Sequence, residues 1–148
     1  MNRSLQHVFA LTLIAIPAFV GCGADPNLGQ VEGVVTLDGK PLPNATVILV
    51  PGQGRPATGV TDGEGRYRVK LTSDRQGTNP GVNRVRITTE RGPSETEDGK
   101  PIPPVAEAVP PQYNAASQLT VDVKKGELTV ANFDLKNDRK ASRDLKRR

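Results

Sequence analysis

Histidine and cysteine, the residue types most used for nucleophilic catalysis and soft-metal binding, each occur once in this 148-residue chain. They are His7 and Cys22, both near the N-terminus. With no other histidine or cysteine, the body of the chain cannot form a Ser–His pair, a Cys–His pair or a histidine-based metal site. A single cysteine also excludes an internal disulfide. The composition therefore predicts no catalytic residue, no metal site and no cofactor.

The segment before Cys22 predicts how the protein is targeted in the cell. Residues 1–7, MNRSLQH, carry one Arg and no acid, and residues 8–20, VFALTLIAIPAFV, are almost wholly apolar. A helix over residues 8–20 would reach about 20 Å, which is short of the ~30 Å hydrocarbon core of a bilayer. Pro17 further weakens a spanning helix. A basic start, a short apolar centre and small residues at its exit predict a secretory signal peptide over residues 1–21.

The residues Phe19-Val20-Gly21-Cys22 resemble a bacterial lipobox, although Phe19 replaces the usual Leu. In such a motif the thiol accepts a diacylglyceryl group at the membrane surface, and the peptidase requires a small residue before the cut. The resemblance implies cleavage between Gly21 and Cys22 and lipidation of Cys22. The alternatives are an unmodified Cys22 at a plain signal-cleavage site, or a retained anchor.

The implied location is the cell envelope, with the protein lipid-anchored at the outer membrane or at the periplasmic face of a bacterial membrane. More than one acyl chain gives stable anchoring, whereas a single chain does not. Gly23, rather than Asp, follows Cys22. By analogy with lipoprotein sorting in some Gram-negative bacteria, this residue permits delivery to the outer membrane.

Charge divides the chain into a slightly acidic body and a basic tail. Residues 136–148, KNDRKASRDLKRR, hold seven Lys or Arg and two Asp, whereas residues 22–135 have a net charge of −2. The tail has no apolar period and is expected to be disordered. It acts either as a solubilising end or as a contact for anionic lipid or cell-wall polymer. Nucleic acid is not an expected partner, because a signal peptide removes the chain from that compartment and no aromatic residues interleave the charges.

The body is predicted to be all-β. After a polar tether at residues 22–29, short segments with alternating apolar residues follow one another between Gly- and Pro-rich turns. Seven such strands indicate a β-sandwich over residues 30–135, with an aliphatic core because aromatic residues are scarce. The predicted strands are residues 30–37, 45–50, 57–61, 66–71, 82–89, 118–123 and 128–135.

Two segments of the body break the simple pattern. In the last strand, Leu128 and Val130 have one parity, whereas Phe133 and Leu135 have the other. A period of two cannot bury both pairs on one face, so a β-bulge or bend that lets both be buried is expected near residues 131–132. Residues 90–112 hold six prolines and five acids, which predicts a long, partly extended loop, after which Tyr113 packs back onto the sandwich.

The turns of the body resemble those of the carboxypeptidase regulatory-like domain. The resemblance rests on Val31-Glu32-Gly33-Val34-Val35, on the stretch DGKPLPNATV at residues 38–47, on TDGEGRY at residues 61–67, and on Pro111-Gln112-Tyr113. It implies a seven-stranded transthyretin-like (prealbumin-like) sandwich, as in lipoproteins of the planctomycete type. The family's pattern contains no active-site residue. For the first turn, we expect Gly39, free to take a positive φ, and Pro41 to send the next strand to the opposite sheet. For the second, we expect Asp62 to accept backbone N–H groups, Gly65 to be left-handed and Tyr67 to point inward.

Five cations are the candidate contact for an anionic surface. They lie on the outward faces of two successive predicted strands, so pairing of those strands would make a basic stripe suited to anionic envelope polymers. The alternative is a solvated, edge-protecting face. The five residues are Arg66, Arg68, Lys70, Arg84 and Arg86. A Ca²⁺ site at Asp38, Asp62 and Glu64 is disfavoured, because Ca²⁺ requires six to eight oxygen ligands and Asp and Gly are ordinary turn residues.

The sequence therefore predicts a non-catalytic, lipid-anchored envelope protein whose sandwich is a structural or binding module. Its expected partners are the membrane, through the N-terminal lipid, and an anionic envelope polymer or another envelope protein. One alternative is carbohydrate binding, for which the body offers only the aromatic residues Tyr67, Tyr113 and Phe133. Another is a hydrolase resembling the transthyretin-related hydroxyisourate type, which is discounted because no histidine follows His7.

Overall fold

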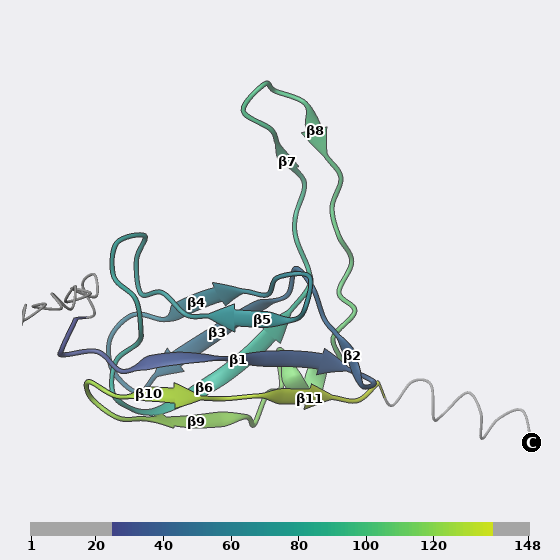
Figure 1. Ribbon diagram of the computed structural model, residues 1–148. Coiled ribbons are helices and arrows are strands. Elements are labelled where there is room, and N and C mark those ends of the chain that lie inside the picture. The colour runs from purple at the N-terminus through teal and green to yellow at the C-terminus, as the bar shows by residue number, and fades with distance from the viewer. Residues whose placement is uncertain (1–24, 138–148) are drawn as a thin grey trace, which may run out of the picture.

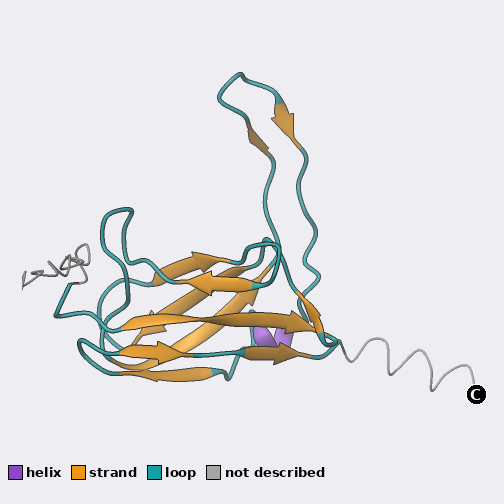
Figure 2. Ribbon diagram, viewed as in Figure 1, coloured by secondary structure: helices purple, strands orange, loops and turns teal. Residues whose placement is uncertain are grey.

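A computed structural model describes residues 25–137, and their regular structure is almost entirely β (Figures 1 and 2). One short 3₁₀ helix, η1 (Pro111–Tyr113), is the exception within that range. The strands are β1 (Gln30–Leu37), β2 (Lys40–Pro41), β3 (Thr46–Pro51), β4 (Ala57–Val60), β5 (Arg66–Arg68), β6 (Gly81–Thr88), β7 (Ser94–Glu95), β8 (Pro101–Ile102), β9 (Thr120–Val123), β10 (Leu128–Val130) and β11 (Phe133–Leu135). The predicted signal peptide and nearly all of the basic tail lie outside the described residues.

Two sheets form a sandwich-like, two-layered body. In the first sheet, β1 is central: β5 and β2 pair antiparallel along one side, and β10 and β11 pair parallel along the other. The second sheet is antiparallel, with the order β4-β3-β6-β9. Figure 1 shows the first sheet in front of the second. The observed class is therefore all-β, as predicted.

The core between the sheets is mainly aliphatic, as the composition predicts. Strand alternation directs one face of each sheet inward, and the inward side chains of both sheets meet in a single cluster. Tyr67 and Phe133 stack within it, with ring centroids 6.2 Å apart. The most completely buried aliphatic side chains are Leu49, Ile87, Leu135, Val31, Val35, Val47, Val69, Val85, Val109 and Val123.

Each of the seven predicted strand segments contains a strand, but the structure has eleven strand segments in its described part. Four additions account for the difference: the short β2, the two strands of a hairpin formed by β7 and β8, and the division of the last strand into β10 and β11. In β6, Val85 and Ile87 point inward and Arg84 and Arg86 outward, which confirms the predicted alternation.

The last strand differs from the prediction in an informative way. It is interrupted at residues 131–132, where a bulge or bend was expected, but β10 and β11 pair with β1 at one constant register. No extra residue resets the parity. Phe133 and Leu135 are buried, whereas Leu128 and Val130 point outward and are 55% and 64% exposed. The premise that both apolar pairs are buried was wrong.

The two predicted turn motifs adopt the expected geometry. Asp62 Oδ1 accepts the backbone N–H groups of Glu64 and Arg66, each at 2.9 Å. Gly65 is left-handed, with φ of 75°, and Tyr67 is buried. In the other motif Gly39 has φ of 77°, after which the chain pairs back on β1 through β2 and crosses to the second sheet.

The Pro-rich segment forms a projecting arm. Residues 90–107 run out from the sandwich and return, and β7 and β8 pair near the tip (Figure 1). Arg91 and Val105 form a second bridge nearer the base. After the arm, Tyr113 packs against the core, as predicted.

A single carboxylate fastens the base of this arm. Glu107 Oε1 accepts the Thr89 N–H at 2.9 Å, the Thr89 hydroxyl at 2.8 Å and the Val109 N–H at 2.8 Å. Its Oε2 accepts from the Thr88 hydroxyl and the Asn114 amide. Partial burial acts to raise the pKa of Glu107, but the hydrogen bonds from Thr88, Thr89 and Val109 outweigh it and lower that pKa to about 2.

We expect Glu107→Gln to destabilise the protein by on the order of 2 kcal/mol at neutral pH, because an amide nitrogen would face N–H and O–H donors. The pKa of Glu107 in the folded protein lies below the ordinary value of 4.5. The stabilisation from the Glu107 carboxylate is therefore complete above pH 4.5 and is lost as the pH falls toward about 2. Urea unfolding at several pH values should show the difference between the two proteins shrinking over that window. The control is Glu97→Gln near the exposed tip of the arm, and an equal effect of both variants would contradict the fastening role.

Candidate functional site

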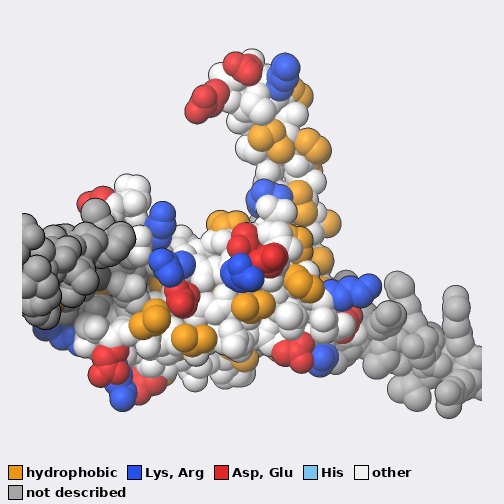
Figure 3. All heavy atoms as spheres, in the orientation of Figure 1, with side chains coloured by type: hydrophobic (Ala, Val, Ile, Leu, Met, Phe, Trp, Pro, Cys, Tyr) orange, Lys and Arg blue, Asp and Glu red, His pale blue; other side chains and the backbone are white. Residues whose placement is uncertain are grey.

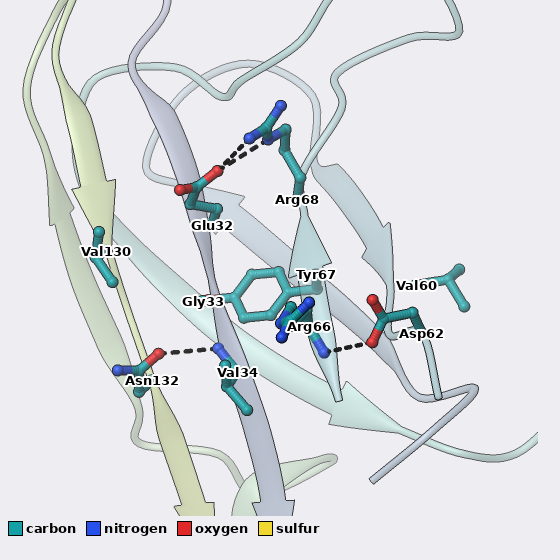
Figure 4. A pocket seen from close by; sticks show the side chains of 10 residues that line it. All are labelled: Glu32, Gly33, Val34, Val60, Asp62, Arg66, Tyr67, Arg68, Val130 and Asn132. Carbon is teal, nitrogen blue, oxygen red and sulfur yellow. Dashed lines mark hydrogen bonds and ion pairs between the residues drawn. The ribbon is translucent and has the colours of Figure 1, made fainter. Parts of the chain in front are cut away.

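The outer face of the first sheet is hollowed between β4, β5, β1 and β10. The hollow has a volume of about 790 Å³ and is open to solvent. Figure 4 shows how its lining residues converge from these strands. They are Glu32, Gly33, Val34, Val60, Asp62, Arg66, Tyr67, Arg68, Val130 and Asn132.

A local break in strand pairing forms the floor of the hollow. Where β10 ends, the Ala131 carbonyl accepts the Tyr67 hydroxyl at 2.7 Å. The Val34 N–H, on the neighbouring strand β1, instead donates to Asn132 Oδ1 at 2.9 Å (Figure 4). A side-chain amide thus replaces a backbone carbonyl in the ladder at this point.

Gly33 is required at this break because the chains approach too closely for a side chain. A Cβ atom on Gly33 would overlap the carbonyl group of Ala131, which is backbone and cannot move independently. Burial raises the pKa of Tyr67, which keeps its hydroxyl protonated as the donor to Ala131.

Ion pairs occupy the polar rim of the hollow. Arg68 donates to Glu32 Oε2 from Nε at 3.0 Å and from Nη2 at 2.5 Å, directly across the β5–β1 pairing. Arg66 pairs with Glu64 at 2.6 Å. The Arg68 side chain is 56% exposed and that of Glu32 30%, so such a pair contributes less than about 1 kcal/mol. These charges are available to rearrange around a ligand at small cost.

Apolar side chains flank the hollow without being buried. Val60 on β4 is 61% exposed and Val130 on β10 is 64% exposed, with Leu128 beside Val130 along the strand. In Figure 3 apolar side chains lie between paired charges on this face. The hollow thus combines apolar flanks with a rim of hydrogen-bonding groups, as ligand-binding surfaces commonly do. Among residues 25–137 no cluster of side chains suited to a metal ion is found.

The structure divides the five predicted cations. Arg66 and Arg68 lie on β5, which pairs with β1, and both line the hollow. Lys70 lies just beyond β5, where its backbone bridges to Thr58 of β4. Arg84 and Arg86 lie on β6 in the second sheet, which pairs with β3 and β9. The strands that carry the two sets do not pair, so the condition for one basic stripe is not met.

The predicted lipidation and cleavage residues, Cys22 and Gly21, lie outside the described residues, and their roles stay predictions. Of the predicted tether, residues 25–29 are described and are bonded to the sandwich. Leu28 is buried, and Gly29 forms a bridge with Thr78. No helix in the described part of the chain is both long enough and apolar enough to cross a membrane.

Sequence reasoning missed most of the hollow. Glu32, Val60, Val130 and Asn132 belong to segments predicted as strands, but nothing local marks them as neighbours. The unused signal was the parity conflict in the last strand. It can be resolved by burying only Phe133 and Leu135, which leaves Val130 on an open face. Glu107 was also missed, because its donors Thr88 and Thr89 are distant in sequence.

Comparison with known proteins gives limited similarity. No protein-family model matches the chain, so the resemblance to the carboxypeptidase regulatory-like domain stays a prediction. No curated protein matches it either. A DUF3823 family protein from Parabacteroides merdae ATCC 43184 is similar in structure at a TM-score of 0.38 and 16% identity, over 75% of this chain and 47% of that one.

A 9R-lipoxygenase from Cyanothece PCC8801 is similar at a TM-score of 0.37 and 13% identity, over 91% of this chain. The chain spans about half the length of the first of these proteins and 18% of the second. At these TM-scores neither likeness carries an argument.

Gly33→Ala should destabilise the protein by at least about 2 kcal/mol, because the added methyl group overlaps backbone at the break in the ladder. The matched control is Gly63→Ala: its added Cβ meets nothing within 4 Å, and its effect should stay within about 0.5 kcal/mol. Chemical denaturation of both variants measures the difference. Equal stabilities would show that Gly33 is not required by packing against Ala131.

Proposed function

We propose that this chain is a lipid-anchored protein of the bacterial cell envelope, held to the membrane by acylated Cys22. Its body is a non-catalytic, transthyretin-like sandwich of the carboxypeptidase regulatory-like type. The body serves as a structural or binding module for another envelope component.

The anchor is supported by the order of residues at the N-terminus. A segment with one Arg and no acid is followed by an apolar run too short to span a bilayer, and then by Gly21 and Cys22. Cys22 is the sole thiol of the chain. This cysteine lies at the end of the apolar run. Because the chain has no second cysteine, Cys22 cannot form a disulfide within it.

The type of sandwich is supported by its turns. The stretch at residues 38–44 turns the chain back on β1 and then across to the second sheet, with Gly39 left-handed. The stretch at residues 61–67 uses Asp62 to bind two backbone N–H groups. These are the conformations that the family resemblance implies for those residues.

The hollow on the first sheet is the observation that carries the binding role. The open face of a sheet that only shields the core is usually polar. Here Val60 and Val130 remain more than half exposed beside an unfilled floor. Burying them against a partner would stabilise a complex through the hydrophobic effect.

A carbohydrate ligand is less well supported. Sugar sites commonly stack the sugar ring on an exposed aromatic side chain. Within residues 25–137, Tyr67 and Phe133 are buried and Tyr113 is partly buried against the core. A basic surface for anionic polymers is also less well supported, because the cations are divided between two sheets.

The anchor predicts that the mature protein, isolated from a bacterial envelope, begins at Cys22 and carries acyl chains. Mass spectrometry of its N-terminal peptide measures this directly, and Cys22→Ser should lack the lipid and leave the membrane fraction. A bare thiol at position 22, or a wild-type protein that is freely soluble after cleavage, would refute the anchor.

The binding role predicts a partner at the hollow. A photo-crosslinking amino acid at position 130 should give a discrete adduct in the native envelope, whereas the same group at position 82 should not. The control is closely matched, since Val82 is a valine with 63% exposure on the outer face of the second sheet. Equal adducts at both positions, or none at 130, would argue against a binding face at the hollow.

A further inference from the structure

The N-terminal segment of the described chain is fixed to one end of the sandwich. Asp25 Oδ2 accepts from Arg75 Nη2 at 2.6 Å and Nε at 3.2 Å. Leu28 is only 3% exposed. Gly29 and Thr78 exchange backbone hydrogen bonds of 3.0 and 2.9 Å. The body is therefore already held at Asp25, five residues before β1 begins.

This attachment limits how far the body can move from an anchor. Cys22 precedes Asp25 by three residues, and three residues span at most about 10 Å. If Cys22 carries the lipid, the end of the sandwich at Asp25 must lie within about that distance of the bilayer surface.

Three loops surround the fixed segment at this end. The turn at residues 124–127 is bonded to it, since the Gly126 N–H donates to the Leu28 carbonyl at 3.0 Å. The loop at residues 72–75 supplies Arg75. The loop at residues 52–55 is hydrogen-bonded to Asn79, whose amide donates to the Gln53 carbonyl at 3.3 Å.

Exposed cations predominate slightly in these three loops. Arg55, Lys124 and Lys125 are exposed and take part in none of the ion pairs of residues 25–137. The acids of these loops are Asp74 and Glu127, and the exposed Asp122 precedes the lysine turn on β9. Lysine and arginine side chains at a surface of anionic lipid each favour contact.

The arm lies at the other end of the molecule. In the second sheet Gly81, at the start of β6, pairs with Val123 beside the lysine turn, and the arm leaves after Thr88 at the opposite end of β6. Figure 1 shows the arm rising, across the strand direction, from the half of the sandwich that lies away from the N-terminal side. Eight residues of strand separate these ends by about 26 Å.

We propose that the end formed by residues 25–29 and the loops 52–55, 72–75 and 124–127 lies against an anionic bilayer. Lys124, Lys125 and Arg55 lie over the lipid headgroups, and the arm leaves the sandwich at the end remote from the membrane. This proposal rests on the proposed function, because it requires the lipid on Cys22.

Site-specific fluorescence quenching tests the orientation. Because Cys22 is the sole native cysteine, and lipidation consumes its thiol, a second cysteine can be labelled alone. The full chain carrying Gln53→Cys or Asp98→Cys would be reconstituted, lipidated, in vesicles of phosphatidylcholine and phosphatidylglycerol that bear a headgroup quencher. The label at position 53 should be quenched and the label at position 98, at the arm tip, should not. Equal quenching, or stronger quenching at 98, would overturn the orientation.

Charge reversal tests the headgroup contact. Each cation near an anionic surface favours contact about fivefold, so Lys124→Glu with Lys125→Glu should reduce quenching at position 53 severalfold in anionic vesicles. The matched control is Arg91→Glu with Lys100→Glu on the arm, which should change nothing. Unchanged quenching after reversal at 124 and 125 would refute the headgroup contact.

Vesicle flotation separates this inference from the proposed function. Wild-type protein should float with the vesicles and Cys22→Ser should not. If wild-type protein carries no lipid and does not float, the anchor and the orientation both fail. If it floats but the labels show no difference between the two ends, the anchor stands and the orientation is wrong.

Discussion

The hydrogen bond from the Tyr67 hydroxyl to the Ala131 carbonyl is the interaction on which the first sheet depends. It joins β5 to the last strand across β1, from inside a largely apolar core where an unpaired carbonyl would be costly. Because that carbonyl turns toward Tyr67, the Val34 N–H requires the Asn132 side chain as its acceptor. The same close approach excludes a side chain at Gly33. The break in the ladder between β1 and the last strand is therefore a consequence of the hydrogen bond that a buried tyrosine makes.

Much of the fold follows from local patterns in the sequence. Period-two alternation located every main strand, because one face of each strand is buried and the other is open. The turns could be predicted because Asp62, Gly65 and Gly39 have backbone preferences that act over a few residues. The last strand shows where this reasoning stops. An apolar residue on an open face cannot be distinguished from a core residue by type alone, so Leu128 and Val130 were assigned to the core.

Contacts between residues that are distant in the chain could not be predicted in this way. The strands that contain Arg66 and Arg84 are successive in the predicted order, yet they belong to different sheets, because β5 pairs with β1. Which strand pairs with which depends on the crossing of the chain between layers, and a period of two does not encode it. Glu107 is similar: its acceptor role depends on Thr88 and Thr89, which the arm brings back beside it only after folding.

The sheet geometry relates the two proposals to each other. The hollow opens on the outer face of the first sheet, and the proposed membrane contact is at the end of the same strands. Strand faces are perpendicular to strand ends, so β1 standing on the bilayer would make the hollow open sideways, along the membrane plane. A partner would then reach Val130 from the side of the molecule and not from above it. The arm, fastened by Glu107 at the far end, rises across the strand direction (Figure 1), so it too would run along the membrane plane.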